Sequence, residues 1–187
     1  MEKLNREQVL SLPNGVTILR ILAIPLILVL LFYVGRGYQL VTGLLFLAAA
    51  VTDTLDGYLA RRRGMVTTLG TFLDPLADKL LIVTSLIALM SAREVPAWMV
   101  IVIVGREIAI TGLRGIAVSQ DIIISASALG KYKTVFEVAS IFFLILNGNY
   151  FFINFHPIGM VFLWVALGIA VISGVNYFWR YLKSIIV

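Results

Sequence analysis

Long apolar stretches separated by short polar segments constrain this chain more than any other feature of its sequence. An α-helix needs about 20 mostly apolar residues to cross a membrane. The chain offers six candidate stretches, which are Val16–Val34, Tyr38–Ala60, Thr68–Met90, Ala97–Ile116, Tyr132–Leu146 (extendable to Phe155) and Pro157–Leu182. The sequence therefore predicts an all-α integral membrane protein with six transmembrane helices, in a single membrane domain over residues 1–187.

The scarcity of charge supports this prediction. Only 13% of the 187 residues are charged, whereas a soluble domain carries about 25%. The formal net charge of +5 fits a protein beside anionic lipids, so we expect membrane lipids as partners and no nucleic acid. The chain has no cysteine, which excludes disulfides and thiolate metal sites. Its first residues show no signal peptide and allow a short N-terminal interfacial helix ended by Pro13.

The basic residues of the polar segments fall mainly on one side of the predicted bundle. That side holds Lys3, Arg6, Arg61, Arg62, Arg63, Lys131, Lys133, Arg180 and Lys183, and the other side holds only Arg36 and Arg93. Lysine and arginine concentrate in cytoplasmic loops. We therefore expect a multi-pass protein of the cell membrane with both termini, and the candidate site described next, facing the cytoplasm.

Four aspartates interrupt the second and third apolar stretches at their predicted cytoplasmic ends. At 100° per residue, one helix face carries Asp53, Asp56, Gly57, Ala60 and Arg61, and the face of the next helix carries Gly70, Asp74 and Asp78. The short turn between the two helices makes them antiparallel neighbours. Both faces are therefore expected to border one cleft.

Clustered carboxylates in a membrane protein indicate a functional site. They repel one another at low dielectric, and acidic residues in membrane helices are costly and usually functional. Divalent cations between them would remove the repulsion. Oxygen-only ligands favour Mg²⁺ or Mn²⁺, and two such ions are typical of phosphoryl chemistry. The neighbouring glycines and alanine either clear space for a substrate or simply pack helices.

The aspartate pattern resembles a known family motif. The spacing Asp53-x2-Asp56-Gly57-x2-Ala60-Arg61-x8-Gly70-x3-Asp74-x3-Asp78 is similar to that of the CDP-alcohol phosphotransferases at every fixed position. The resemblance implies that Asp53, Asp56, Asp74 and Asp78 hold two divalent metal ions and that Asp78 is also the general base. It further implies that Gly57, Ala60 and Gly70 line a cytidine pocket, that Arg61 contacts the diphosphate, and that the protein is a homodimer.

Three further stretches are similar to one branch of that family, the phosphatidylglycerophosphate synthases. They are "LPNGVTILRI", "GREIAITGLRGIAVSQ" and "ALGKYKT". This resemblance implies an enzyme that transfers the phosphatidyl group of CDP-diacylglycerol to sn-glycerol 3-phosphate and releases CMP. It also implies that Asn14, Thr17 and Arg20 help to enclose the nucleotide.

A second cluster of charge suits the phosphate of such an acceptor. Arg106 and Arg114 are eight residues apart and hence near one helix face, and Lys131 and Lys133 begin the next predicted helix. Four converging cations can bind a phosphate. The alternative is an ordinary cluster of cytoplasmic basic residues. We favour a binding role most strongly for Arg106, because it lies deep in an apolar stretch.

Other functions stay open at this point. Within the family, the phosphatidylinositol-phosphate, phosphatidylserine and cardiolipin synthases are alternatives, and the first of these also needs a phosphate site. A cation transporter or channel is a different class, which typically places acids near the bilayer midplane between inverted repeats. Here the acids lie at predicted cytoplasmic ends and no repeat is visible, which favours the enzyme.

Overall fold

The computed structural model describes residues 12–33, 35–63, 68–120, 128–150 and 153–186. Within these ranges the side chains of residues 12–14, 16, 53–63, 68–72, 128, 149–150 and 184–186 lie outside the described part. The elements are α2 (Leu12–Leu31), α3 (Arg36–Arg63), α4 (Thr68–Ser91), α5 (Ala97–Ser119), α6 (Ala128–Leu146), β1 (Asn149–Tyr150), β2 (Ile153–Asn154) and α7 (Phe155–Ile186). The described part of the chain is thus almost entirely helical, with one helix for each predicted apolar stretch.

Most helix ends differ from the predicted ones by a few residues. Helix α2 begins at Leu12, four residues early, because a proline in the first turn loses no helical hydrogen bond. The interfacial helix expected before Pro13 falls on residues outside the described part. Helix α6 ends at Leu146, so the extension to Phe155 is wrong. Asn147 and Gly148 interrupt the helix there, and a two-stranded antiparallel hairpin follows.

The six helices do not all qualify as membrane spans by length and composition. In the described part of the chain, only Phe155–Lys183 of α7 is long and apolar enough, and Thr17–Leu31 is a shorter apolar helix. Helix α5 fails because Arg106, Glu107 and Arg114 lie within its 23 residues. The six helices are therefore observed, whereas their number of membrane crossings stays a prediction.

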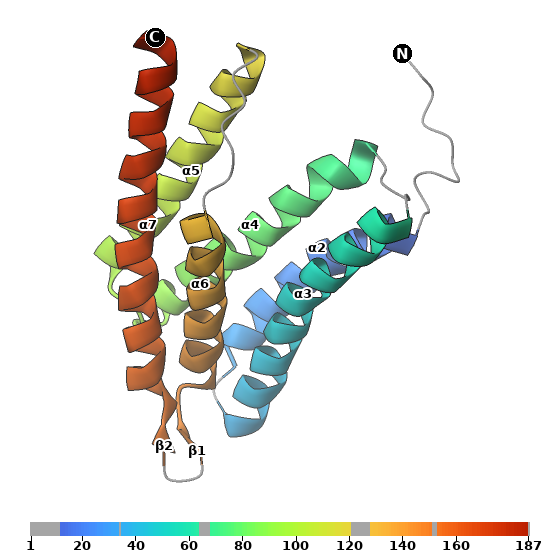
Figure 1. Ribbon diagram of the computed structural model, residues 1–187. Coiled ribbons are helices and arrows are strands. Elements are labelled where there is room, and N and C mark those ends of the chain that lie inside the picture. The colour runs from blue at the N-terminus through green and yellow to red at the C-terminus, as the bar shows by residue number, and fades with distance from the viewer. Residues whose placement is uncertain (1–11, 34, 64–67, 121–127, 151–152, 187) are drawn as a thin grey trace.

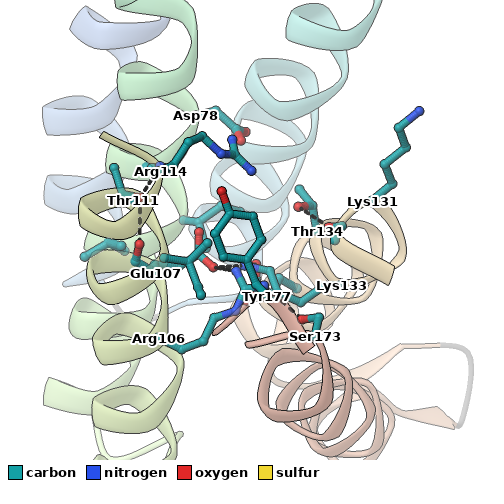
Figure 2. A pocket seen from close by; sticks show the side chains of 16 residues that line it. Asp78, Arg106, Glu107, Thr111, Arg114, Lys131, Lys133, Thr134, Ser173 and Tyr177 are labelled. Carbon is teal, nitrogen blue, oxygen red and sulfur yellow. Dashed lines mark hydrogen bonds and ion pairs between the residues drawn. The ribbon is translucent and has the colours of Figure 1, made fainter. Parts of the chain in front are cut away.

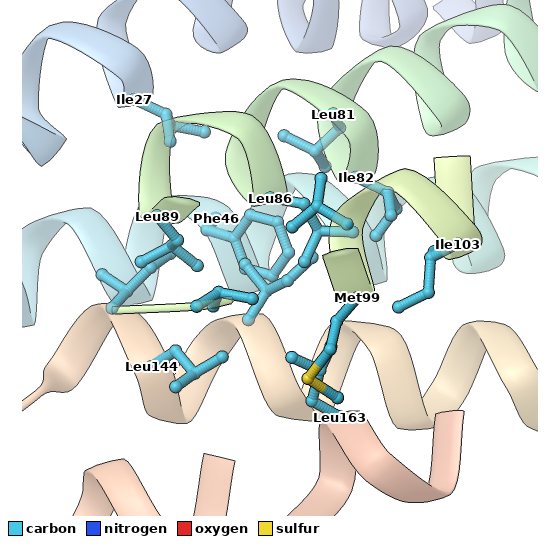
Figure 3. Packing of buried hydrophobic residues seen from close by; sticks show 14 of the residues in the cluster. Ile27, Phe46, Leu81, Ile82, Leu86, Leu89, Met99, Ile103, Leu144 and Leu163 are labelled. Carbon is cyan, nitrogen blue, oxygen red and sulfur yellow. The ribbon is translucent and has the colours of Figure 1, made fainter. Parts of the chain in front are cut away.

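The helices pack around one apolar core to which every helix contributes. Helices α6 and α7 run side by side from the hairpin, α5 packs against α7, and α2 packs against α3 and α4 (Figure 1). The core contains Ile27 of α2, Phe46 of α3, Leu81 and Leu86 of α4, Met99 and Ile103 of α5, Leu144 of α6 and Leu163 of α7 (Figure 3). This shared core fixes the helices that carry the charged residues relative to one another.

The close packing of α6 against α7 depends on a glycine. A Cβ atom at Gly159 of α7 would lie 2.7 Å from the Leu144 Cγ atom and 3.0 Å from its backbone nitrogen. The Ser140 hydroxyl also donates a hydrogen bond to the Gly159 carbonyl, at 2.9 Å. A side chain at Gly159 would therefore push α6 and α7 apart.

We expect Gly159→Ala to destabilise the protein by about 1–3 kcal/mol, the usual cost of overpacking a tight contact. The matched control is Gly168→Ala on the same helix, where an added Cβ meets no atom within 4 Å. Thermal unfolding of the purified protein in detergent measures both. A melting temperature of Gly159→Ala equal to that of the control would contradict the close contact between α6 and α7.

Candidate active site

A pocket of about 240 Å³ lies between α4, α5, α6 and α7. Among the described residues, the charged ones that line it are Asp78, Lys79, Arg106, Glu107, Arg114, Lys131, Lys133 and Glu137 (Figure 2). Among the described side chains, the pocket therefore brings together the motif aspartate Asp78 and all four cations that the sequence suggested for a phosphate. These residues come from three different helices, so their convergence is a result of the fold.

Helix α4 positions the two motif aspartates whose side chains are described. Asp74 and Asp78 are one helical turn apart, and both are partly exposed. Asp74 accepts a hydrogen bond from the hydroxyl of Thr17, a buried residue of α2, and Asp78 lines the pocket. The structure thus places Thr17, suggested for the nucleotide, beside one of the suggested metal ligands.

A second contact joins α2 to the helix that carries the other aspartates. The Arg20 side chain is only 4% exposed, and its Nε atom donates a hydrogen bond to the Ala49 carbonyl of α3, at 3.0 Å. Ala49 lies one turn before Asp53. The remaining suggested residues of this half of the site have side chains outside the described part: Asn14, Asp53, Asp56, Gly57, Ala60, Arg61 and Gly70.

Lys133 is buried and paired with two carboxylates. Its side chain is 3% exposed, and its ammonium group contacts Glu107 of α5. The same group lies 3.1 Å from the Glu137 Oε2 atom, one turn further along α6. Much of the Lys133 charge is therefore neutralised inside the protein, which leaves less of it for a ligand.

Arg106 is also held by the protein. Its Nη1 atom lies 2.5 Å from the Glu107 Oε1 atom, its Nη2 atom donates to the Ser173 hydroxyl at 2.9 Å, and its Nε atom donates to the Ala170 carbonyl at 3.3 Å. A guanidinium group has five N–H donors, and these contacts use one donor on each of its three nitrogen atoms. Arg106 therefore ties α5 to α7 along one wall of the pocket.

Arg114 and Lys131 are the suggested cations with the most accessible side chains. Both residues are exposed. The Arg114 Cζ atom lies 5.9 Å from the centre of the Tyr177 ring, in range of a cation–π interaction. Figure 2 shows Lys131 extending away from the other labelled side chains, at the rim of the pocket. These two residues present positive charge that no carboxylate contact given above neutralises.

The pocket residues that were not anticipated from the sequence include Lys79, Glu137 and Tyr177. Lys79 follows Asp78 directly and donates a hydrogen bond to the Thr111 hydroxyl, at 2.5 Å. Glu137 lies four residues after Lys133, a spacing that brings side chains together on a helix, so this pair could have been found. Tyr177 belongs to α7, which is long and apolar enough to cross a membrane, and nothing in its local sequence separates it from a packing residue.

The donor atoms at the site suit a hard divalent cation. Among the described side chains, no group of three or more histidine, cysteine, aspartate or glutamate residues could hold a metal ion, but Asp53 and Asp56 are outside that set. The chain's single histidine, His156, is bound near the hairpin end, where its Nε2 atom lies 3.4 Å from the Glu94 Oε2 atom. The motif therefore offers carboxylate oxygens, which Mg²⁺ and Mn²⁺ prefer.

Known proteins are similar to this chain over most of its length. The CDP-alcohol phosphatidyltransferase family matches residues 10–172. A CDP-diacylglycerol–glycerol-3-phosphate 3-phosphatidyltransferase of Bacillus subtilis (strain 168) is 40% identical, over 93% of this chain and 98% of its own. A probable phosphatidylglycerophosphate synthase of Mycobacterium tuberculosis (strain ATCC 25618 / H37Rv) is 38% identical, over 96% of this chain and 86% of its own.

Proposed function

The chain belongs to the CDP-alcohol phosphatidyltransferase family, and from this premise we propose that it transfers the phosphatidyl group of CDP-diacylglycerol to sn-glycerol 3-phosphate. The products are phosphatidylglycerophosphate and CMP. Relatives that carry the name of this activity align with nearly the whole chain. The observation that carries the proposal is the pocket in which Asp78 lies among the cations of α4, α5 and α6.

Asp78 supplies the general base of the proposed reaction. A neutral alcohol is a weak nucleophile, and a carboxylate within hydrogen-bond reach can take its proton as the new bond forms. The acceptor oxygen attacks the phosphorus that bears diacylglycerol. The bond from that phosphorus to the oxygen bridging to CMP breaks, and CMP leaves with this oxygen. We propose direct displacement without a covalent enzyme intermediate.

The exposed cations bind the acceptor. Arg114 and Lys131 hold the phosphate of glycerol 3-phosphate, while Arg106 and Lys133 form the charged wall behind it. Fixing the phosphate turns the free primary hydroxyl toward Asp78, so binding energy is converted into orientation. A neutral alcohol would gain nothing from these cations, which is why we favour a phosphorylated acceptor.

The motif helices bind the donor and its metal ions. Two Mg²⁺ or Mn²⁺ ions would be held by Asp53, Asp56, Asp74 and Asp78, and they would supply positive charge to the diphosphate oxygens. Arg61 contacts the diphosphate, Gly57, Ala60 and Gly70 line the cytidine pocket, and Asn14, Thr17 and Arg20 close the nucleotide end. The contacts of Thr17 and Arg20 with α4 and α3 support this placement of α2.

The protein acts in the cell membrane, with six spans and the site facing the cytoplasm. Large apolar side chains cover its outer surface, for example Leu19, Phe32 and Ile101, which are each at least 67% exposed. Patches of this kind mark contact with lipid or protein. A homodimer is part of the same proposal and rests on the family resemblance.

Single introduced cysteines test this orientation, because the chain has none of its own. We expect Met65→Cys, beside the Arg61–Arg63 run, to react only with reagents that reach the cytoplasm. Asn149→Cys in the hairpin should react only with external reagents, because the basic side of the bundle faces inward. Labelling of intact cells with a membrane-impermeant maleimide measures both, and the reverse pattern would contradict the orientation.

The purified protein tests the reaction itself. With labelled CDP-diacylglycerol and a divalent cation, we expect CMP to appear only after glycerol 3-phosphate is added, in equal amount with phosphatidylglycerophosphate. Release of CMP at the same rate without an acceptor would show a hydrolase and contradict the proposal.

A further inference from the structure

Two buried oxygen atoms of the pocket have no hydrogen-bond partner among the described residues. They are the Glu137 Oε1 atom and the Tyr177 hydroxyl oxygen, and both residues line the pocket. The Glu137 side chain is 2% exposed, and Tyr177 is 7% exposed. Buried polar groups are almost always paired, so two such atoms in one pocket indicate where a ligand makes its hydrogen bonds.

The two carboxylate oxygens of Glu137 have different surroundings. Its Oε2 atom lies 3.1 Å from the Lys133 ammonium group, which fixes the carboxylate on α6. Its Oε1 atom is an acceptor without a donor. A phosphate dianion offers only acceptor oxygens and cannot satisfy this atom, whereas an alcohol hydroxyl can donate to it. The ligand group that suits Glu137 is therefore a hydroxyl.

Tyr177 can donate a hydrogen bond to the phosphate, which Glu137 cannot do. Its ring packs beneath the Arg114 guanidinium group (Figure 2), so its hydroxyl lies beside a cation that we assign to the acceptor phosphate. A phenol hydroxyl can donate a hydrogen bond to a phosphate oxygen. Bonds to a charged partner are shorter and stronger than bonds between neutral groups.

We propose that Glu137 and Tyr177 determine which acceptor this enzyme uses, an inference that rests on the proposed function. Glu137 accepts a hydrogen bond from the non-reacting secondary hydroxyl of glycerol 3-phosphate, and Tyr177 donates one to its phosphate. The primary hydroxyl is left for Asp78. The pocket thus recognises a vicinal hydroxyl next to a phosphate, and not the phosphate alone.

The enzyme should therefore discriminate against an acceptor that lacks the secondary hydroxyl. A site built to bind a hydroxyl rejects the analogue that lacks it, because the buried group then stays unpaired. The probe is 3-hydroxypropyl phosphate, which keeps the primary hydroxyl and the phosphate. We expect the wild-type kcat/KM to be about ten- to 150-fold higher for glycerol 3-phosphate, the range of one hydrogen bond to a charged group.

Two substitutions of Glu137 test its role. In Glu137→Gln we expect the preference for glycerol 3-phosphate over 3-hydroxypropyl phosphate to fall by about five- to tenfold, because the group that accepts the hydrogen bond is no longer charged. In Glu137→Leu the preference should disappear. The kcat/KM for 3-hydroxypropyl phosphate should change little in Glu137→Gln. If Glu137 had only a structural role, each substitution would lower kcat/KM by the same factor for both acceptors. An equal loss of kcat/KM for the two acceptors, in both variants, would therefore overturn the inference. Glu94→Gln, at the hairpin end, is the control.

Tyr177→Phe gives an independent readout. It removes the hydroxyl and keeps the ring under Arg114. We expect the KM of both acceptors to rise about tenfold, with the preference between them and the KM of CDP-diacylglycerol unchanged. Tyr132→Phe on the exposed face of α6 is the control. Unchanged KM values for the acceptors in Tyr177→Phe would overturn the proposed hydrogen bond from the Tyr177 hydroxyl to the phosphate.

The wild-type measurement separates the two proposals. If the enzyme uses glycerol 3-phosphate and the analogue equally well, the selectivity inference is wrong and the proposed function stands. If it uses neither, the proposed function is wrong and the inference fails with it.

Discussion

Asp78→Asn is expected to lower the turnover number by at least about a hundredfold. An amide cannot take a proton from the acceptor hydroxyl, and general-base catalysis is typically worth a factor of 10² to 10⁴. Of the two motif aspartates whose side chains are described, Asp78 is the one that lines the pocket with the cations, and we propose that it acts on the acceptor. The measurement is the steady-state rate of phosphatidylglycerophosphate formation by the purified protein.

The other three motif aspartates should behave in the same way for a different reason. Asp53→Asn, Asp56→Asn and Asp74→Asn each remove a carboxylate from the proposed metal site, and loss of such electrostatic stabilisation costs about a hundredfold or more. EDTA should abolish activity, and Mg²⁺ or Mn²⁺ should restore it. The matched control is Asp121→Asn, because Asp121 is the only other aspartate of the chain. Full activity in EDTA, or in any two of these motif variants, would contradict the mechanism.

Arg114→Ala and Lys131→Ala are expected to raise the KM for glycerol 3-phosphate by about ten- to 150-fold each. Loss of one charge-assisted contact costs about 1.5–3 kcal/mol, and both side chains are exposed enough to reach a ligand. The KM for CDP-diacylglycerol should change much less. Initial rates at varied acceptor concentration provide the measurement.

The paired cations should respond differently. Lys133→Ala would remove the ion-pair partner of the buried Glu137 carboxylate. Removal of one member of a buried ion pair is strongly destabilising. We therefore expect loss of thermal stability in that variant.

Arg180→Ala is the control for Arg114 and Lys131, because Arg180 is a basic residue of α7 outside the pocket lining. If Arg114→Ala and Lys131→Ala keep the wild-type KM, the cluster is only a signal of membrane topology.

The positions of the helices could be predicted because each apolar stretch is bounded by polar residues. The hairpin could not, because "NGNYFFINFHP" contains no charge and its aromatic residues suit a helix or a strand. The convergence of Arg106, Arg114, Lys131 and Lys133 was predicted from their position at one membrane face, and the pocket contains all four.

What the sequence did not reveal is which charges of the pocket pair between different helices. The contact between Lys133 and Glu107 joins α6 to α5, and such a pairing between helices depends on their packing and leaves no local pattern. The same holds for Tyr177, which reaches the pocket only because α7 packs against α5. The cleft between Asp53, Asp56, Asp74 and Asp78 stays a prediction, because the first two side chains lie outside the described part.

The choice of acceptor tests the central claim most directly. Purified protein with labelled CDP-diacylglycerol would be given equal concentrations of glycerol 3-phosphate, inositol phosphate, glycerol, serine and inositol, and the lipid products would be separated and counted. We expect phosphatidylglycerophosphate to be the dominant product, because the cations that line the pocket suit a phosphate and the unpaired Glu137 oxygen suits the hydroxyl beside it. A dominant product from inositol phosphate, or from an acceptor without phosphate, would contradict the account.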